Sequence, residues 1–302
     1  MSKPLDWVRI GIAIVGGDKR EAEIARLAAL AGAKVKVHGF PVPPAAIAGV
    51  EATERPDQAM AGVRFALFPM AGMKDGLLYA PHAAKPIRPD AQMLSGMAPK
   101  AHIILGHADA ELKSAAAQRG IVLHEREHDR ELRLSRAPSV VEGALSVIIQ
   151  NTEISIHRAQ VLVFGYGPIG ALLGRALDGL GARVTIAARN PQQRAAAIAY
   201  GLEAVPLDGA DAIAPDLDMV VNTVPHRIVE RGFLAKLRAG SLVLDLASPP
   251  GGIDLDAAKS LGHRALWARG LGSRAPLTVG RCQWEGARGL IERICLDASA
   301  AS

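Results

Sequence analysis

Apolar and polar positions divide the chain into short buried strands that alternate with amphipathic helices. Strand-length apolar runs lie at 8–15, 34–39, 63–69, 102–106, 121–124, 161–165, 183–188, 219–222 and 241–245. Helical patterns follow several of them, at 21–31, 109–119 and 171–180. Buried strands that alternate with helices are typical of parallel sheets covered on both faces. The pattern predicts an α/β protein with two Rossmann-like, doubly wound parallel-sheet domains around an interdomain cleft.

The order of these elements suggests the domain boundaries. We expect an N-terminal domain over 1–137, a dinucleotide-binding domain over 138–276 that opens with a linking helix at 138–151, and a C-terminal helix over 277–302 that returns to the first domain. The linking helix is expected to begin with Ser139 as N-cap and Glu142 as its capping-box partner. The mixed-charge run before it, 125–136, is typical of a solvated face.

The second series of strands opens with a glycine motif. Val161-Leu-Val-Phe ends in Gly165-Tyr-Gly167-Pro-Ile-Gly170, and a helical pattern follows. In a dinucleotide-binding βαβ unit, three such glycines make the turn, let backbone approach a pyrophosphate and let the helix pack closely. The motif therefore predicts a dinucleotide site. Its candidate residues are Gly165, Tyr166, Gly167, Pro168, Ile169 and Gly170.

The tip of the next strand indicates which dinucleotide is preferred. A carboxylate there would bind the ribose 2′-hydroxyl of NAD, but the sequence reads Ala188-Arg189-Asn190, with Arg194 one turn later. A guanidinium pairs with a phosphate and gains nothing comparable from a hydroxyl. We therefore expect NADP rather than NAD, with Arg189, Asn190 and Arg194 at the 2′-phosphate; the alternative is a merely solvated Arg189.

Two further strand ends should lie at the same sheet edge, beside the nicotinamide. The additional cofactor candidates are Asn222, Thr223, Val224, Pro225, Asp245, Leu246 and Ala247. His226 directly follows the first of these ends and is the candidate catalytic base. Glu142 is a second candidate for proton transfer, with helix capping as its structural alternative.

The first strand ends in Gly16-Gly-Asp18-Lys-Arg20. Asp18 would repel a phosphate, so we expect no second dinucleotide here; it should instead cap the following helix. Arg20 in the first helical turn opposes the helix dipole, which suggests an anionic partner, although a solvent-facing side chain explains it equally well. The loop-rich segment 70–99 contains Lys85 and is a candidate substrate-facing lid.

Composition narrows the functional classes. The chain has 302 residues and a formal charge of +5, which suits a small anion, but no basic run is interleaved with aromatic residues. Nucleic-acid binding is therefore disfavoured. Cys282 and Cys295 lie in one predicted helix, too far apart to pair, and no metal-ligand spacing is present. The N-terminal residues 1–7 carry no long apolar stretch, and we expect a cytoplasmic protein without membrane spans.

Several short motifs together resemble the family of dipicolinate synthase A subunits along nearly the whole chain. They are Gly16-Gly-Asp-x-Arg20, Pro138-Ser-Val-Val-Glu-Gly143, Gln150-Asn-Thr with Ile156-His157, Asn222-Thr-Val-Pro225, Asp245-Leu-Ala-Ser-x-Pro-Gly-Gly-x-Asp254, and Gly270-Leu with Ala275-Pro-x-Thr278. The resemblance implies a nicotinamide-dependent conversion of 4-hydroxytetrahydrodipicolinate to pyridine-2,6-dicarboxylate during sporulation. It also implies a second, flavoprotein-like component of dipicolinate synthase, its B subunit, and we expect a homo-oligomer.

The implied dicarboxylate substrate requires at least two cations. The candidate substrate-binding residues are Arg20, Asp18, Lys85, Ser248 and Arg274. The chain departs from the family pattern at Pro249, where a basic residue is expected, and at Gly272-Ser273, where Pro-Gly is usual. These departures suit either a divergent member with relocated cations or a paralogue with another carboxylate substrate.

Two other functions fit the same architecture. A D-2-hydroxyacid or amino-acid dehydrogenase also has two nucleotide-binding-type domains, but it would need an arginine after the fifth strand, where this chain has Ser248-Pro249. An NADP-binding subunit without chemistry of its own would have an indistinguishable sequence.

Overall fold

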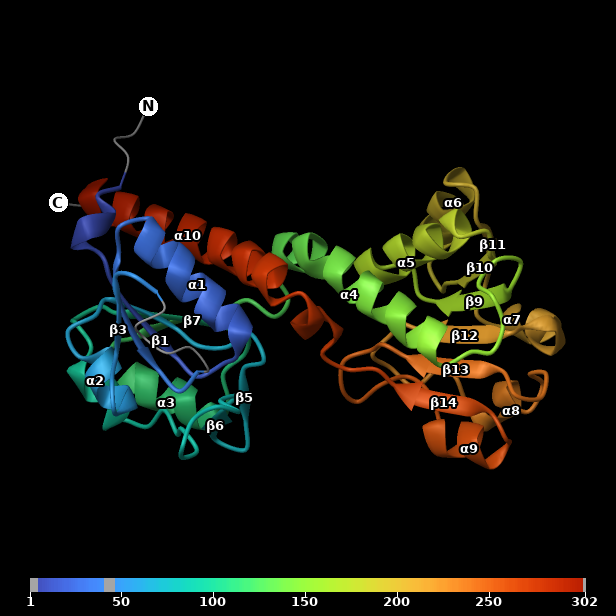
Figure 1. Ribbon diagram of the computed structural model, residues 1–302, viewed down its shortest axis with the longest axis horizontal. Coiled ribbons are helices and arrows are strands. Elements are labelled where there is room, and N and C mark those ends of the chain that lie inside the picture. Colours follow the sequence, from blue (N-terminus) through green and yellow to red (C-terminus); the bar gives the residue numbers. More distant parts are fainter. Residues whose placement is uncertain (1–4, 41–46, 301–302) are drawn as a thin grey trace. The chain divides into compact units, whose positions relative to one another are not determined.

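The computed structural model describes residues 5–40 and 47–300, so residues 1–4 of the N-terminal segment considered above lie outside the described residues. The chain forms two compact units (Figure 1). Unit 1 consists of Met1–Ser135 with Ala275–Ser302, and unit 2 of Arg136–Arg274. Unit 1 is thus discontinuous in sequence, because the last helix, α10 (Pro276–Ala300), packs on the first, α1 (Lys19–Leu30).

Unit 1 is built on a six-stranded sheet in which every neighbouring pair is parallel. In spatial order the strands are β3 (Val50–Ala52), β2 (Lys34–His38), β1 (Gly11–Val15), β4 (Phe65–Leu67), β7 (His102–Leu105) and β8 (Val122–Glu125). The remaining elements are η1 (Trp7–Arg9), α2 (Pro56–Met60), a hairpin of β5 (Met73–Lys74) and β6 (Leu77–Leu78), η3 (Met93–Gly96) and α3 (Ala110–Gln118).

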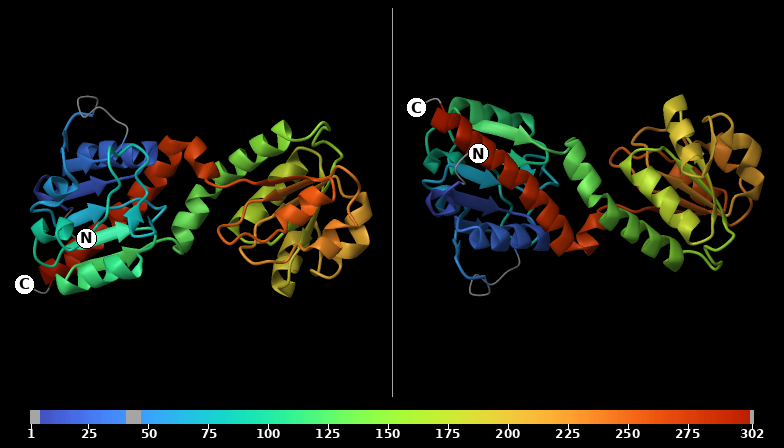
Figure 2. Two further views of the ribbon diagram at one scale, coloured as in Figure 1. Left: turned by 90° about the horizontal axis from the view of Figure 1, so that it is seen from below. Right: turned by 90° about the horizontal axis from the view of Figure 1, so that it is seen from above.

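Successive side chains of a strand point to opposite faces of the sheet, so alternate residues of the central strand β1 pack into two different hydrophobic cores. Ile12 and Ile14 pack with residues of α1 and α10, including Trp284. Ala13 and Val15 pack on the opposite face with α2, η3 and α3. Figure 2 shows α10 lying across the strands of this sheet. A layer of helices therefore covers each face.

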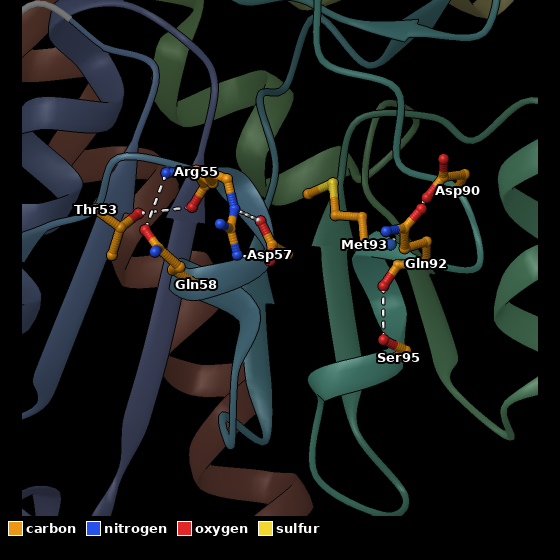
Figure 3. A network of polar contacts seen from close by, with 8 residues as sticks. All are labelled: Thr53, Arg55, Asp57, Gln58, Asp90, Gln92, Met93 and Ser95. Atoms are coloured by element: carbon orange, nitrogen blue, oxygen red, sulfur yellow. Dashed lines mark hydrogen bonds and ion pairs between the residues drawn. The ribbon is translucent and has the colours of Figure 1, made fainter.

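Local polar contacts fix the two short helices on the second face (Figure 3). At the start of α2, the backbone N–H of Arg55 donates to Gln58 Oε1 at 3.1 Å. At the start of η3, the backbone N–H of Met93 donates to Asp90 Oδ1 at 2.8 Å. Both contacts satisfy amide groups near helix starts.

Unit 2 repeats the same topology. Its six parallel strands are, in spatial order, β11 (Glu203–Val205), β10 (Arg183–Ala187), β9 (Gln160–Phe164), β12 (Met219–Asn222), β13 (Leu242–Asp245) and β14 (Arg264–Trp267). Its other elements are α5 (Pro168–Gly179), α6 (Pro191–Ala199), α7 (Ala210–Ile213), η4 (Ala214–Asp216), α8 (Arg231–Leu234), α9 (Leu255–Ser260) and η5 (Leu271–Arg274). The prediction of two doubly wound parallel sheets is confirmed.

The predicted start of the linking helix was wrong. Helix α4 runs over Arg130–Gln150 and passes through Pro138. Asp129 supplies the cap, because its Oδ1 accepts from the N–H of Leu132 at 2.9 Å. Ser139 is a buried residue inside the helix rather than its N-cap. The charged run before Pro138 is therefore mostly the first turns of α4, and Glu142 has no capping-box partner.

Both cysteines, Cys282 and Cys295, are free thiols. Within the described ranges, no group of three or more metal-ligating side chains comes together. No helix in that part of the chain combines the length and apolarity needed to cross a membrane.

Candidate functional site

The glycine loop between β9 and α5 can be built only from glycine at its first and third positions. Gly165 has φ +93°, and a Cβ there would lie 2.7 Å from Thr223 Oγ1. A Cβ on Gly170 would lie 2.1 Å from the carbonyl oxygen of Gly165, a contact that backbone cannot relieve by a small shift. Gly165 thus makes the turn, and Gly170 lets α5 pack against it.

The second glycine faces open space. A Cβ on Gly167 would meet no atom within 4 Å. Gly167 is the N-cap of α5 and provides no side-chain cap, so the N–H groups of Ile169 and Gly170 have no acceptor within the helix. Free amide groups, the positive end of the helix dipole and open space together fit a pyrophosphate. Tyr166, Pro168 and Ile169 are half-buried around this position.

The sheet register brings the remaining candidates to the same edge. Phe164, at the end of β9, lies beside Ala187 of β10 on one side and Asn222 of β12 on the other. Asn222 in turn lies beside Asp245 of β13. The strand order reverses direction between β9 and β12, and ligands of open α/β sheets bind beyond the carboxyl ends of the strands at such a point.

The tip of β10 presents one free arginine and one that supports the loop. Arg194 Nη1 donates to the carbonyl oxygens of Ala188 and Arg189, at 2.7 and 2.9 Å. Asn190 caps α6 by accepting from the N–H of Gln192 at 2.8 Å. These two side chains hold the loop, whereas the Arg189 side chain is exposed and available to a phosphate.

The side chains of Asn222 and Asp245 form a buried network, and this changes the role expected for them. Asn222 is fully buried, and its Nδ2 donates to Asp245 Oδ1 at 2.8 Å and to the Val224 carbonyl at 2.9 Å. Asp245 also accepts from the N–H groups of Ala247, Gly252 and Ile253 at 3.0, 2.7 and 3.1 Å. Both residues shape the loops at the sheet edge instead of presenting a free side chain to a dinucleotide.

The neighbouring candidates on these loops differ in exposure. Thr223 is half-buried, and its Oγ1 donates to the Phe164 carbonyl at 2.8 Å, which ties the β12 loop to the glycine loop. Val224 is half-buried, and Pro225 is exposed. Leu246 and Ala247 are buried, whereas His226 and Ser248 are exposed. His226 is therefore accessible to a ligand at this edge.

Glu142 and Arg274, expected to serve proton transfer and substrate binding respectively, form an ion pair with each other. Both are exposed, with 60% and 51% of the side chain accessible, so the pair contributes little to stability. Beside them, Gly143 packs on Leu271 of η5. Either residue would have to leave this pair to act on a substrate.

In unit 1, the predicted cap at Asp18 is confirmed. Asp18 Oδ1 accepts from the N–H of Arg20 at 3.0 Å, and both carboxylate oxygens bind the Arg20 guanidinium at 2.9 Å. Only 15% of the Arg20 side chain is exposed, so it is not a solvated surface arginine. Lys85, in the loop-rich segment 70–99, is exposed.

Sequence reasoning missed Glu21 and Tyr79, which surround this pair. Glu21 is 2% exposed and completes a capping box with Asp18, a signal that the Asp-x-x-Glu spacing did contain. Burial raises the pKa of Glu21 to about 7, although Arg20 opposes the shift. Burial also raises the pKa of Tyr79, and the nearby carboxylate of Asp18 adds to the shift.

Comparison with known proteins gives consistent matches. Residues 11–126 match the family model for the N-terminal domain of the A subunit of dipicolinate synthase. The dipicolinate synthase A subunit of Bacillus subtilis is 30% identical over 277 residues, which cover 89% of this chain and 92% of that protein.

Solved structures extend the match to the fold. The crystal structure of the dipicolinate synthase A subunit from Bacillus halodurans superposes with a TM-score of 0.85 at 28% identity, covering 92% of this chain and 96% of that one. The crystal structure of the A chain of dipicolinate synthase from Bacillus subtilis superposes with a TM-score of 0.84 at 27% identity, and the match covers 97% of this chain and 98% of that one. A transhydrogenase from Sinorhizobium meliloti shares the fold with a TM-score of 0.69 at 17% identity, covering 93% and 94%. By the identity and coverage of its relatives, the chain belongs to the family of dipicolinate synthase A subunits.

Proposed function

We propose that the protein is an NADP-dependent oxidoreductase that converts 4-hydroxytetrahydrodipicolinate to dipicolinate. The observation that carries the proposal is the match to the Bacillus subtilis dipicolinate synthase A subunit along nine-tenths of both chains. The open position at Gly167, the free amide groups of α5 and the exposed Arg189 support NADP as the cofactor.

The overall reaction balances with the loss of one water, one hydride and one proton from the substrate ring. Loss of the ring hydroxyl as water requires a general acid, and aromatisation requires a base for the ring proton. When bound, the nicotinamide accepts the hydride. The chain itself must then bind two carboxylates and move the protons.

In unit 2, we assign proton transfer to His226, because it is exposed at the carboxyl edge of the sheet, next to the β12 loop that Thr223 ties to the glycine loop. Glu142 is the weaker candidate, since its carboxylate is paired with Arg274. Ser248 is a candidate hydroxyl donor on the β13 loop.

In unit 1, we assign the binding of one substrate carboxylate to Arg20, whose guanidinium Asp18 holds in a fixed direction. We assign the binding of the second carboxylate to Lys85, which is exposed.

We propose that the chain acts in the cytoplasm during sporulation, as a homo-oligomer, together with the flavoprotein-like B subunit of dipicolinate synthase. The relative's designation as one subunit of its enzyme supports a partner of this kind.

The proposal is tested by mixing the purified chain with NADP and freshly prepared 4-hydroxytetrahydrodipicolinate, with and without the B subunit. Absorbance of reduced nicotinamide and of the pyridine ring should rise together. His226→Ala should lose turnover and retain NADP affinity, whereas His128→Ala, an exposed histidine of unit 1, should behave as the parent. Turnover of a 2-hydroxy acid or an amino acid instead would identify another dehydrogenase. NADP binding without turnover of any substrate would identify a non-catalytic subunit.

A further inference from the structure

One carboxyl group of α1 is buried with an unused oxygen. Glu21 is 2% exposed, and its Oε2 accepts from the N–H of Asp18 at 2.8 Å. Its Oε1 is buried and has no hydrogen-bond partner among the described residues. Glu23, two residues later, is equally buried at 3%, but Arg26 binds both of its oxygens at 2.7 Å. An unpaired buried carboxylate is costly, so Glu21 requires an explanation that Glu23 does not.

The surroundings of Glu21 form a compact polar cluster at the carboxyl end of β1. The cluster comprises Asp18, Arg20, Glu21 and Tyr79. Glu21 lies against the turn at Gly17, where an added Cβ would be 2.3 Å from its Oε2. The N–H of Gly17 donates to the Tyr79 carbonyl at 2.7 Å. Helix α10 packs on the first turns of α1 through Gly280, where an added Cβ would lie 2.6 Å from the Arg20 carbonyl oxygen and 2.8 Å from Glu23 Cβ.

The position of the cluster in the sheet is the one at which open α/β sheets bind ligands. Strand β1 lies between β2 and β4, so the strand order of unit 1 reverses direction beside it. Ligands bind beyond the carboxyl ends at such a point. The cluster therefore combines a binding position, a mostly buried cation and a buried carboxyl group with a free oxygen.

The charge of the cluster depends on one proton. Asp18 balances Arg20, with both carboxylate oxygens bound to the guanidinium. An ionised Glu21 then makes the cluster negative and opposes a bound anion, whereas a neutral Glu21 leaves it uncharged. Burial raises the pKa of Glu21 to about 7, so both forms exist near neutral pH.

We propose that an anionic ligand binds beside Arg20 with uptake of a proton by Glu21, so that this site binds small carboxylates more tightly as the pH falls. The inference rests on the proposed function, because it takes the dicarboxylate of that reaction as the ligand. It adds Glu21 to the site and a proton to the binding equilibrium.

The expected effect follows from linkage. A bound anion adds a like charge near Glu21 and raises its pKa, here by about one unit. The affinity should then fall about tenfold between pH 6 and pH 9. At pH 7.5, binding should take up roughly half a proton. A dicarboxylate with ordinary carboxyl groups stays ionised across this range and does not contribute.

The experiment is calorimetry of pyridine-2,6-dicarboxylate binding to the full chain with NADP present, at several pH values and in buffers of different ionisation enthalpy. The parent should show the pH dependence and the proton uptake. Glu21→Gln, which keeps the shape and can still accept from the Asp18 N–H, should bind with an affinity independent of pH and without proton uptake. Glu23→Gln, the matched control on the same helix, should behave as the parent.

The outcomes separate this inference from the proposed function. Binding of equal affinity at all pH values in the parent, or proton uptake that persists in Glu21→Gln, overturns the role of Glu21 and leaves the function intact. Absence of dicarboxylate binding at every pH overturns the substrate assignment and this inference with it. A carbon-13 NMR titration of the ligand-free chain gives a further check, since an ordinary titration of the Glu21 carboxyl also overturns the inference.

Discussion

Gly167→Ala should weaken NADP binding while leaving the fold intact. Gly167 has φ −81° and ψ −171°, which alanine adopts without strain, and its Cβ would meet no atom within 4 Å. Such a substitution stabilises a fold by about 0.4–1 kcal/mol, because the unfolded chain loses freedom. The added methyl group would occupy the space through which a pyrophosphate approaches the amide groups of α5. Loss of one charge-assisted hydrogen bond costs about 1.5–3 kcal/mol, roughly a tenfold to hundredfold loss of affinity.

Two further glycines of α5 serve as controls for this prediction. Gly179, near the other end of the helix, also faces open space, so Gly179→Ala should stabilise the ligand-free chain and leave NADP affinity unchanged. Gly170→Ala should destabilise unit 2, because its Cβ would overlap the Gly165 carbonyl oxygen. Thermal unfolding without ligand reports the stability of each variant, and calorimetric titration with NADP reports the affinity.

Two results would refute the reasoning. Parent-like NADP affinity in Gly167→Ala would mean that no phosphate approaches this loop. A loss of stability comparable to that of Gly170→Ala would mean that the space beside Gly167 is not open in solution.

Three other changes have defined outcomes. Arg189→Asp should reverse the preference for NADP over NAD, at a cost to NADP of about 1.5–3 kcal/mol, and equal affinity of the parent for both dinucleotides would contradict the argument. Asp245→Ala leaves three buried backbone N–H groups unpaired and removes one of the two acceptors of Asn222 Nδ2, so we expect denaturant unfolding of unit 2 to show a loss of more than about 3 kcal/mol. Burial, with smaller effects of His124 and Arg64, lowers the pKa of His102 to about 4. The ordinary pKa of a histidine is near 6.5, so the free energy of unfolding should fall as the pH drops from 6.5 to 4, by about 1 kcal/mol after allowance for partial exposure. His102→Gln should show a smaller fall, and His124, whose pKa burial also lowers, should account for part of the remainder.

The strands that carry the glycine loop and the predicted site were readable from the sequence because they are buried on both faces. The strands β3, β11 and β14 were missed for the opposite reason. Each has at most one buried residue, so burial on both faces does not mark it as it marks the central strands. Helix α4 was misplaced because Pro138 and Ser139 look like a helix start, whereas packing of the surrounding apolar residues carries the helix through the proline.

The roles of side chains at the site were less predictable than their positions. Asn222 and Asp245 were expected at the cofactor because of where their strands end, and the register places both at the carboxyl edge of the sheet, beside the end of β9. Their engagement with each other and with the following loop depends on hydrogen bonds between distant residues, which no local pattern contains. The same holds for the pair of Glu142 and Arg274, which are far apart in sequence.

The discontinuity of unit 1 has a consequence for how the chain folds during synthesis. Strands β1 to β8 leave the ribosome first, but one of their two cores is completed only by residues that are made after unit 2, Trp284, Ala287 and Ile291 of α10. Unit 2 lies wholly between these parts in sequence. At about 5–20 residues per second, the N-terminal sheet waits on the order of ten to thirty seconds for its final helix. Unit 1 therefore begins first but is completed after unit 2, and the part of its apolar face that α1 does not cover stays exposed until α10 has been made.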